Sequence, residues 1–157
     1  MPQLNSIQSL EQCIGLPAAE FVMHREPMLL LDTLVGCIGE TTVCEWTVGQ
    51  DDAFVEVGLG VPAYIGVEFM AQCVAVHAGA RARVEGKGPP LGYLLGTRHF
   101  NARVSHFAIG ETYRAICEEL IRDGNGLGSY DCKIMQGDRC IANARLAVAE
   151  KEQGPDL

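Results

Sequence analysis

The sequence predicts an α+β fold in which a strongly curved antiparallel sheet wraps around one long buried helix. The first observation is that residues 62–84 are apolar on nearly every side, a pattern typical of a helix that is covered all round. The second is that strand-like segments joined by turn signals both precede and follow this helix. A flat sheet covers only one side of a helix, so the sheet is expected to curve.

Two segments before the helix have the composition of strands. Residues 28–38 are strongly apolar, and residues 41–48 alternate cleanly between two faces. The residues "GE" at 39–40 are the expected hairpin turn between them. Residues 17–21 are expected to form a short helical turn with a proline near its start. The two faces of the second strand carry Thr42, Cys44, Trp46 and Val48 on one side and Val43, Glu45 and Thr47 on the other.

The long helix is expected to pack closely against another part of the backbone. Gly66 and Gly79 lower its intrinsic helix propensity, and glycine within a helix usually has a packing reason. The glycine- and proline-rich stretch "EGKGPP" at residues 85–90 ends the helix.

Four strand-like segments follow the helix. Tight turns at "DGNGLG" and "QGD" predict that the last three form an antiparallel meander. The four segments are residues 91–105, 111–122, 129–135 and 139–149. A curved antiparallel sheet around one helix is the architecture called the hotdog fold, and its exposed edge is expected to be covered by edge pairing in a two-fold dimer.

The length and the net charge limit the number of domains and the kinds of partner that this protein can have. The chain of 157 residues is expected to form one domain over residues 1–157, with a core at 17–149 and a frayed tail at 150–157. The net charge of −8 argues against nucleic acid as a partner, because phosphate binding needs a basic face.

The cysteines and the apolar segments point to a cytoplasmic protein. The seven cysteines include no CxxC pair, which favours free thiols in a reducing compartment over a metal or disulfide framework. The N-terminus has no signal-peptide pattern. Residues 61–80 are long enough to span a bilayer, but Glu68, Gln72 and His77 within them argue against a membrane span.

Glu68 and His24 are the candidate catalytic residues. Glu68 is the only charged side chain between Pro62 and Ala80, and a carboxylate in apolar surroundings is a candidate general acid or base. The alternative is an anion placed near the helix N-terminus, or one paired with an arginine. His24 can exchange protons near neutral pH, although a structural histidine at the start of a strand is the alternative.

The stretches that carry these two residues resemble the 3-hydroxyacyl-[acyl carrier protein] dehydratases of fatty acid synthesis. "HREPMLLLD" is similar to the family pattern L-P-H-R-x-P-x-L-L-x-D, and "GVEFMAQ" is similar to the helix pattern G-V-x-x-x-E-x-x-A-Q. A weaker match covers "RHFNARVSHFAIGE". The matching residues are His24, Arg25, Pro27, Leu29, Leu30 and Asp32, then Glu68, Ala71 and Gln72, then Arg98, Phe100, Val104, Gly110 and Glu111.

The resemblance implies a dehydratase that uses no metal, nucleotide or other cofactor. His24 would act on the C2 proton and Glu68 would protonate the leaving hydroxyl, with each site taking one residue from each subunit of a dimer. The acyl chain would lie in an apolar tunnel beside the helix. Gln72 would orient the substrate by a hydrogen bond, or else satisfy a polar contact within the helix interface. Tyr64 would line the tunnel, or else belong to the core.

One family motif is missing. The enzymes carry G-H-F-P-G before the helix, where a glycine N–H faces the thioester oxygen. Here the stretch is "FVEVGLGVPAYIGVE", in which Gly58 and Gly60 are the candidate backbone donors. This shorter helix entrance is similar to a smaller branch of hotdog proteins, encoded with aryl-polyene and related biosynthetic systems, that work beside a second hotdog dehydratase.

The partners implied are an acyl carrier protein or coenzyme A thioester and either an identical subunit or another hotdog protein. Acyl carrier proteins are acidic, so docking would need basic residues, although basic residues at a helix end also favour the helix dipole. Two other functions stay open: a thioesterase, and a non-catalytic acyl-binding or scaffold subunit of an active partner. The basic candidates are Arg25, Arg81, Arg83, Lys87 and Arg98.

Overall fold

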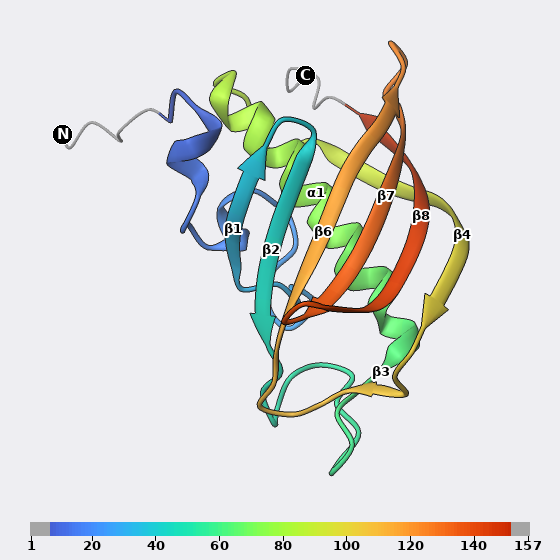
Figure 1. The fold of residues 1–157 in the computed structure, drawn as a ribbon. Helices are drawn as coiled ribbons and strands as arrows, with labels where there is room; N and C mark the ends of the chain where they lie inside the picture. The colour runs from blue at the N-terminus through green and yellow to red at the C-terminus, as the bar shows by residue number, and fades with distance from the viewer. Residues whose placement is uncertain (1–6, 152–157) are drawn as a thin grey trace, which may run out of the picture.

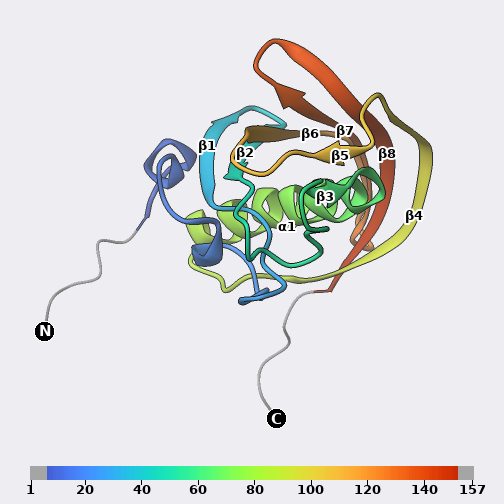
Figure 2. The same cartoon turned by 90° about the horizontal axis from the view of Figure 1, so that it is seen from below.

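The structure, a computed structural model, describes residues 7–151 and consists of one long helix held in the concave face of a curved sheet (Figure 1). The helix is α1, Gly66–Val84. Figure 2 shows the sheet curling around it. This arrangement confirms the predicted hotdog fold. The strands are β1 (Thr33–Ile38), β2 (Thr41–Thr47), β3 (Val61–Pro62), β4 (Leu91–Ala102), β5 (His106–Phe107), β6 (Thr112–Arg122), β7 (Leu127–Gln136) and β8 (Arg139–Lys151).

The main sheet has six strands in the order β1-β2-β6-β7-β8-β4, and each neighbouring pair is antiparallel. The predicted meander is therefore β6-β7-β8. The strand β4 follows α1 in the chain and lies at one edge of the sheet, beside β8. Residues 150 and 151, expected in a frayed tail, belong to β8, and the rest of that tail lies outside the described residues.

The first strand is shorter than predicted. The sequence favours a strand over residues 28–38, but β1 begins only at Thr33. The backbone N–H groups of Met28 and Leu29 donate to the carbonyl oxygen of Arg25, which makes a turn instead of a ladder. Leu29, Leu30 and Leu31 pack against the core without belonging to a strand. Three short 3-10 helices complete the fold: Leu10–Cys13, Ala18–Glu20 and Ala63–Ile65.

The long helix begins four residues later than predicted. Val61 and Pro62 pair with Phe107 and His106 as the two-stranded sheet β3-β5. The 3-10 helix Ala63–Ile65 then leads into α1. As a result, Glu68 lies in the first turn of α1, where the helix dipole favours an anion.

An aromatic cluster joins α1 to the concave face of the sheet. Trp46 on β2 stacks on Phe69 of α1 with ring centroids 4.1 Å apart. Phe107 and Tyr113 pack edge-on against each other beside them, with centroids 5.2 Å apart. Aromatic pairs of this kind add about 0.5–1.5 kcal/mol to the stability gained from burial. The β2 face that carries Trp46 is buried, in agreement with its alternation.

The predicted close approach to the helix is present at Gly79. A Cβ atom there would overlap the carbonyl oxygen of Phe21 and would lie 2.7 Å from its carbonyl carbon. At Gly66 the neighbours are side chains, those of Ile134 and Phe107, at 3.3 Å. Gly79 therefore allows the segment before His24 to cross directly over α1.

Within the described residues, no helix has both the length and the hydropathy needed to cross a membrane.

Candidate active site

A cavity of about 390 Å³ runs along the one stripe of α1 that the sheet leaves partly open. Small side chains on this stripe, Ala71, Ala75 and Ala78, recur at about one helical turn and leave room above the helix. The other walls come from residues 21–24, from residues 90–94 at and just before the start of β4, and from Val148 and Glu150 on β8. The resemblance implied a cavity beside the helix. The wall formed by β4 could not be predicted, because β4 reaches the helix through contacts between residues far apart in the sequence.

His24 and Glu68 face each other at this cavity. Nε2 of His24 lies 3.9 Å from Oε1 of Glu68, and their side chains are 38% and 39% exposed. Glu68 is thus half-open to solvent, in contrast to the buried carboxylate expected from the apolar helix. Both residues belong to the same chain, so the two-subunit arrangement implied by the resemblance is not needed to bring them together.

Arg25 shapes the turn that presents His24. Its Nη1 donates to the carbonyl oxygens of Val22 and His24, each at 2.7 Å, and to that of Ala19 at 3.3 Å. This guanidinium nitrogen therefore already binds the local backbone. A structural role for Arg25 is favoured over a role in docking a carrier protein. Nδ1 of His24 is buried without a hydrogen-bond partner among the described residues, so Nε2 is the nitrogen directed toward Glu68.

Gln72 lies in the wall of the site. Its side-chain Nε2 donates to Oε1 of Glu68 at 2.9 Å and to the carbonyl oxygen of Met28 at 2.8 Å. Its Oε1 accepts the backbone N–H of Leu30 at 2.8 Å. Only 1% of Gln72 is exposed. The residue is placed next to Glu68 as predicted, but its amide is turned to the protein and away from a substrate.

Three predicted substrate-binding residues lie elsewhere. Tyr64 sits in the 3-10 helix before α1, is 69% exposed and does not line the cavity. Gly58 and Gly60 lie in the loop before β3, and neither lines the cavity. The N–H of Gly60 already donates to the carbonyl oxygen of Glu56 at 3.0 Å. The structure therefore does not bring the candidate backbone donors to His24 and Glu68.

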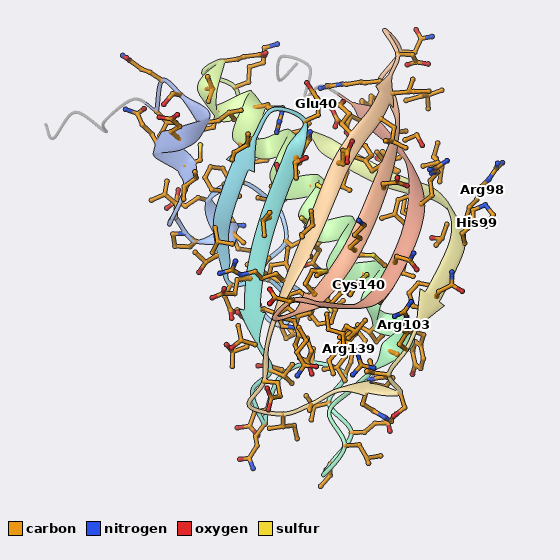
Figure 3. All side chains as sticks on the ribbon, in the orientation of Figure 1. Glu40, Arg98, His99, Arg103, Arg139 and Cys140 are labelled. Atoms are coloured by element: carbon orange, nitrogen blue, oxygen red, sulfur yellow. The ribbon has the colours of Figure 1, made fainter. Side chains whose placement is uncertain are left out.

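The remaining basic candidates lie at the C-terminal end of α1 and on β4. Arg83 pairs with Glu20 at 3.3 Å, and Lys87 pairs with Glu85 at 3.5 Å near the C-terminal end of α1. Arg98 projects from β4, away from the body of the protein, as Figure 3 shows. Docking of a carrier protein by these residues stays a prediction.

Arg81 belongs to a polar cluster under the β1–β2 hairpin. It donates to Nδ1 of His77 at 3.0 Å and also to the carbonyl oxygen of Gly39. The hydroxyl of Thr42 lies 2.8 Å from the same Nδ1, and Nε2 of His77 lies 3.6 Å from Oε2 of Glu119. His77 is 1% exposed, and burial, with the charge of Arg81 second, lowers its pKa to about 3. His77 is thus a packed, neutral histidine.

The same cluster contains a group of potential metal ligands. Within residues 7–151, Glu40, His77 and Glu119 have ligand atoms within 4.8 Å of one another. However, an arginine can only donate, so the contact from Arg81 makes Nδ1 of His77 the acceptor. Nε2 then carries the proton and has no lone pair to offer a metal ion; it lies 3.6 Å from Oε2 of Glu119, beyond hydrogen-bond distance. The arrangement therefore does not favour metal binding.

Glu119 predicts a pH dependence of stability. Burial, followed by the neighbouring carboxylate of Glu40, raises the pKa of Glu119 to about 7, against the opposing charges of Arg122 and Arg81. The folded state therefore holds a proton that the unfolded state releases from about pH 4.5 upward, and stability is lost as pH rises to about 7. We expect Glu119→Gln to leave the melting temperature unchanged at pH 5 and to raise it at pH 8, by about 2–6 °C.

The comparison needs a control, because the lowered pKa of His77 also makes stability depend on pH, in the opposite direction. The free energy of unfolding gained by keeping His77 neutral is lost as the pH falls. Glu118→Gln changes an exposed carboxylate on the same strand and should have equal effects at both pH values. Equal stabilisation by Glu119→Gln at pH 5 and pH 8 would contradict the raised pKa.

The sheet wrapped around one helix, with a cavity along that helix, defines a hotdog protein, and solved structures agree. A chain of the dehydratase heterocomplex ApeI:P from Xenorhabdus doucetiae has a TM-score of 0.82 and 25% identity, covering 88% of this chain and 93% of that one. A Thermus thermophilus protein has a TM-score of 0.60 and 13% identity, covering 82% and 100%. A Staphylococcus aureus thioesterase has a TM-score of 0.58 and 16% identity, covering 76% and 92%. The last two likenesses show the fold alone.

The family follows from the sequence model of the ApeP-like family, described as ApeP dehydratase, which matches residues 16–156. The chain belongs to the ApeP-like dehydratase family. This membership agrees with the resemblance to hotdog dehydratases of aryl-polyene-type systems and supports a dehydratase-type function. No curated protein matches the chain.

Proposed function

We propose that this chain dehydrates a 3-hydroxyacyl thioester, carried by an acyl carrier protein, to the trans-2-enoyl thioester in a fatty-acid-like biosynthesis. The observation that carries the proposal is the pair formed by His24 Nε2 and Glu68 Oε1, 3.9 Å apart at an apolar cavity. Membership of the ApeP-like dehydratase family supports the reaction class. The carrier and the pathway rest on the resemblance described above.

The two residues can divide the proton transfers between them. Neutral His24 takes the proton from C2, and the electron pair of that C–H bond becomes the second bond between C2 and C3. The bond from C3 to the hydroxyl oxygen breaks, and Glu68 in its acid form donates the proton that completes the leaving water. The imidazolium of His24 then returns a proton to the carboxylate of Glu68. At 3.9 Å the two groups are not hydrogen-bonded to each other, and both lie within reach of adjacent carbons of a substrate placed beside the pair.

The cavity suits the acyl part of such a substrate. The apolar part of its helix wall comes from Ala71, Val74, Ala75 and Ala78, and its opposite wall includes Leu91 and Leu94. Burial of a chain in such a groove is favourable by about 0.8 kcal/mol for each methylene group. The apolar groove therefore provides binding energy, while His24 and Glu68 act at the thioester end.

A second hotdog subunit is part of the proposal. Among the described residues, the edge strand β4 pairs only with β8, and it exposes Tyr93, Leu94 and Leu95. A long, exposed, apolar edge strand favours pairing with another strand. The similar chain from Xenorhabdus doucetiae was solved as part of a dehydratase heterocomplex. We propose that this chain pairs likewise, with a second copy or with another hotdog dehydratase.

A non-catalytic subunit is the second candidate function. It is favoured by the absence of G-H-F-P-G and by the N–H of Gly60, which is already occupied. Without a donor for the thioester oxygen, the charge that develops there lacks stabilisation, and one such donor is worth about 10²–10³ in rate. In this alternative the chain would bind acyl groups or support an active partner.

The test is an assay of the purified chain, alone and with a co-purified hotdog dehydratase, on 3-hydroxyacyl thioesters of carrier protein and of coenzyme A. Loss of water is followed by mass, and free thiol reports thioesterase activity. Turnover that requires His24 and Glu68 supports the proposal. Turnover only with the partner, unchanged by His24→Ala and Glu68→Gln, would establish the supporting role instead.

The compartment is also a proposal. All seven cysteines are free thiols and six of them are buried. Buried free thiols fit a reducing compartment, and we propose the cytoplasm.

A further inference from the structure

Gln72 connects the two parts of the chain that carry the proposed catalytic pair. It lies one turn after Glu68 on α1, and it contacts the backbone of residues 28–30, shortly after His24. A side-chain amide has two N–H donors and one oxygen acceptor. Here the nitrogen donates to Glu68 and Met28, and the oxygen accepts from Leu30. Both donors are therefore occupied before any substrate binds.

The contacts to Met28 and Leu30 replace a missing strand ladder. Residues 28–32 precede β1 and form no strand, so their buried backbone groups need other partners. Gln72 binds one carbonyl oxygen and one N–H of this stretch, each at 2.8 Å. These two hydrogen bonds hold the stretch against α1, as those of a neighbouring strand would. They lie four to six residues after His24.

The contact to Glu68 fixes the orientation of its carboxyl group. Oε1 of Glu68 accepts from Gln72 at 2.9 Å, and the same atom faces Nε2 of His24. An oxygen that accepts this N–H is disfavoured as the site of the acid proton, so the acid form of Glu68 carries its proton on Oε2. Oε2 is then the atom that delivers the proton to a leaving hydroxyl.

We infer that Gln72 is a positioning residue, which holds Glu68 and the His24 segment in one fixed geometry, and not a ligand of the substrate. The inference rests on the proposed dehydration for its effect on rate, but its structural part can be measured without turnover. Gln72 is almost completely buried, and all three of its hydrogen bonds are shorter than 3 Å. Such contacts are strong enough to limit motion of both partners.

The experiment compares Gln72→Leu and Gln72→Glu by amide hydrogen exchange and by steady-state kinetics. Leucine removes all three hydrogen bonds, and we expect the Leu30 amide to exchange at least about tenfold faster. The Asp32 amide, which donates to the backbone of Glu45, is the internal control and should keep its rate. Glutamate retains the acceptor for Leu30 but removes both donors, so it should preserve Leu30 protection.

The kinetic result separates positioning from substrate binding. We expect both variants to lower kcat about a hundredfold, because misplacement of a catalytic group by about 1 Å has an effect of this size, while KM changes less than about threefold. A raised KM with unchanged kcat would identify Gln72 as a substrate ligand and overturn the inference. Unchanged Leu30 exchange in Gln72→Leu would also overturn it. If the wild-type protein has no turnover, the proposed function fails, and the Leu30 measurement alone decides whether Gln72 holds the segment.

Discussion

Glu68→Gln and His24→Ala are each expected to lower kcat for dehydration by about a thousandfold, the usual size of general acid–base catalysis. Glutamine keeps the shape of Glu68 but cannot donate a proton to the leaving hydroxyl. Alanine at position 24 removes the base for the C2 proton. Since both side chains are half-exposed, neither change should unfold the protein. The measurement is the rate of water loss from a 3-hydroxyacyl thioester, with thermal melting as the check on folding.

Matched controls exist for both variants. Glu26→Gln alters an exposed carboxylate close to His24 in the chain, and His99→Ala removes an imidazole that points away from the body of the protein in Figure 3. Both controls should keep full activity. The double variant of His24 and Glu68 should be little worse than either single one, because groups that act as a unit have non-additive effects. Additive losses would mean that the two residues do not act in one step.

The positions of the pair also predict the behaviour of mixed homodimers. When His24→Ala and Glu68→Gln subunits are combined, a site built from two subunits would recover one intact pair per dimer. A site built within one subunit recovers none. Because His24 and Glu68 meet within one chain, we expect no recovery of turnover. In an equal mixture about half of the dimers are mixed, so recovery to about a quarter of the wild-type rate would return the site to the subunit interface.

Features with a strong local pattern could be predicted from the sequence. The long helix, the alternation that buries Trp46 and the meander after α1 follow from periodicity and turn residues, and the structure agrees. Gly79 was correctly predicted to allow close backbone packing, because a glycine in a buried helix has few other uses. His24 and Glu68 could be proposed as a pair because each is a polar group in an apolar or motif-like setting, and their catalytic role stays a prediction.

Features set by distant contacts could not be predicted. Residues 28–32 look like a strand, but a side chain 40 or more positions later, Gln72, takes the hydrogen bonds that a strand would use. Tyr64 has helical spacing to Glu68, but α1 begins after it, since Val61 and Pro62 pair with β5. Arg81 looks like a surface residue of the helix end, yet His77 and the β1–β2 turn draw it inward. In each case a partner far away in the sequence decides the local structure.

Gly79→Ala is expected to lower the free energy of unfolding by about 3 kcal/mol, a value at the upper end for overpacking a well-filled core. Helix propensity alone predicts the opposite sign, because alanine is favoured over glycine in a helix by about 1 kcal/mol. The contact with Phe21 outweighs this gain. The added methyl group would overlap its carbonyl oxygen and lie 3.0 Å from its Cβ, so backbone atoms would have to move. For a domain of this size the loss corresponds to a melting temperature lower by about 6–12 °C.

Gly66→Ala in the same helix is the matched control. Its new methyl group would meet side-chain atoms of Ile134 and Phe107 at 3.3 Å and of Phe100 at 3.6 Å, and these can shift by a few tenths of an ångström. We expect a change within about 1 kcal/mol, since propensity and mild crowding oppose each other. Stabilisation by Gly79→Ala would show that Phe21 does not cross α1 at this point. Because His24 follows Phe21 by three residues, the same displacement should also reduce turnover in whatever fraction of Gly79→Ala remains folded, which ties the packing of the helix to the geometry of the site.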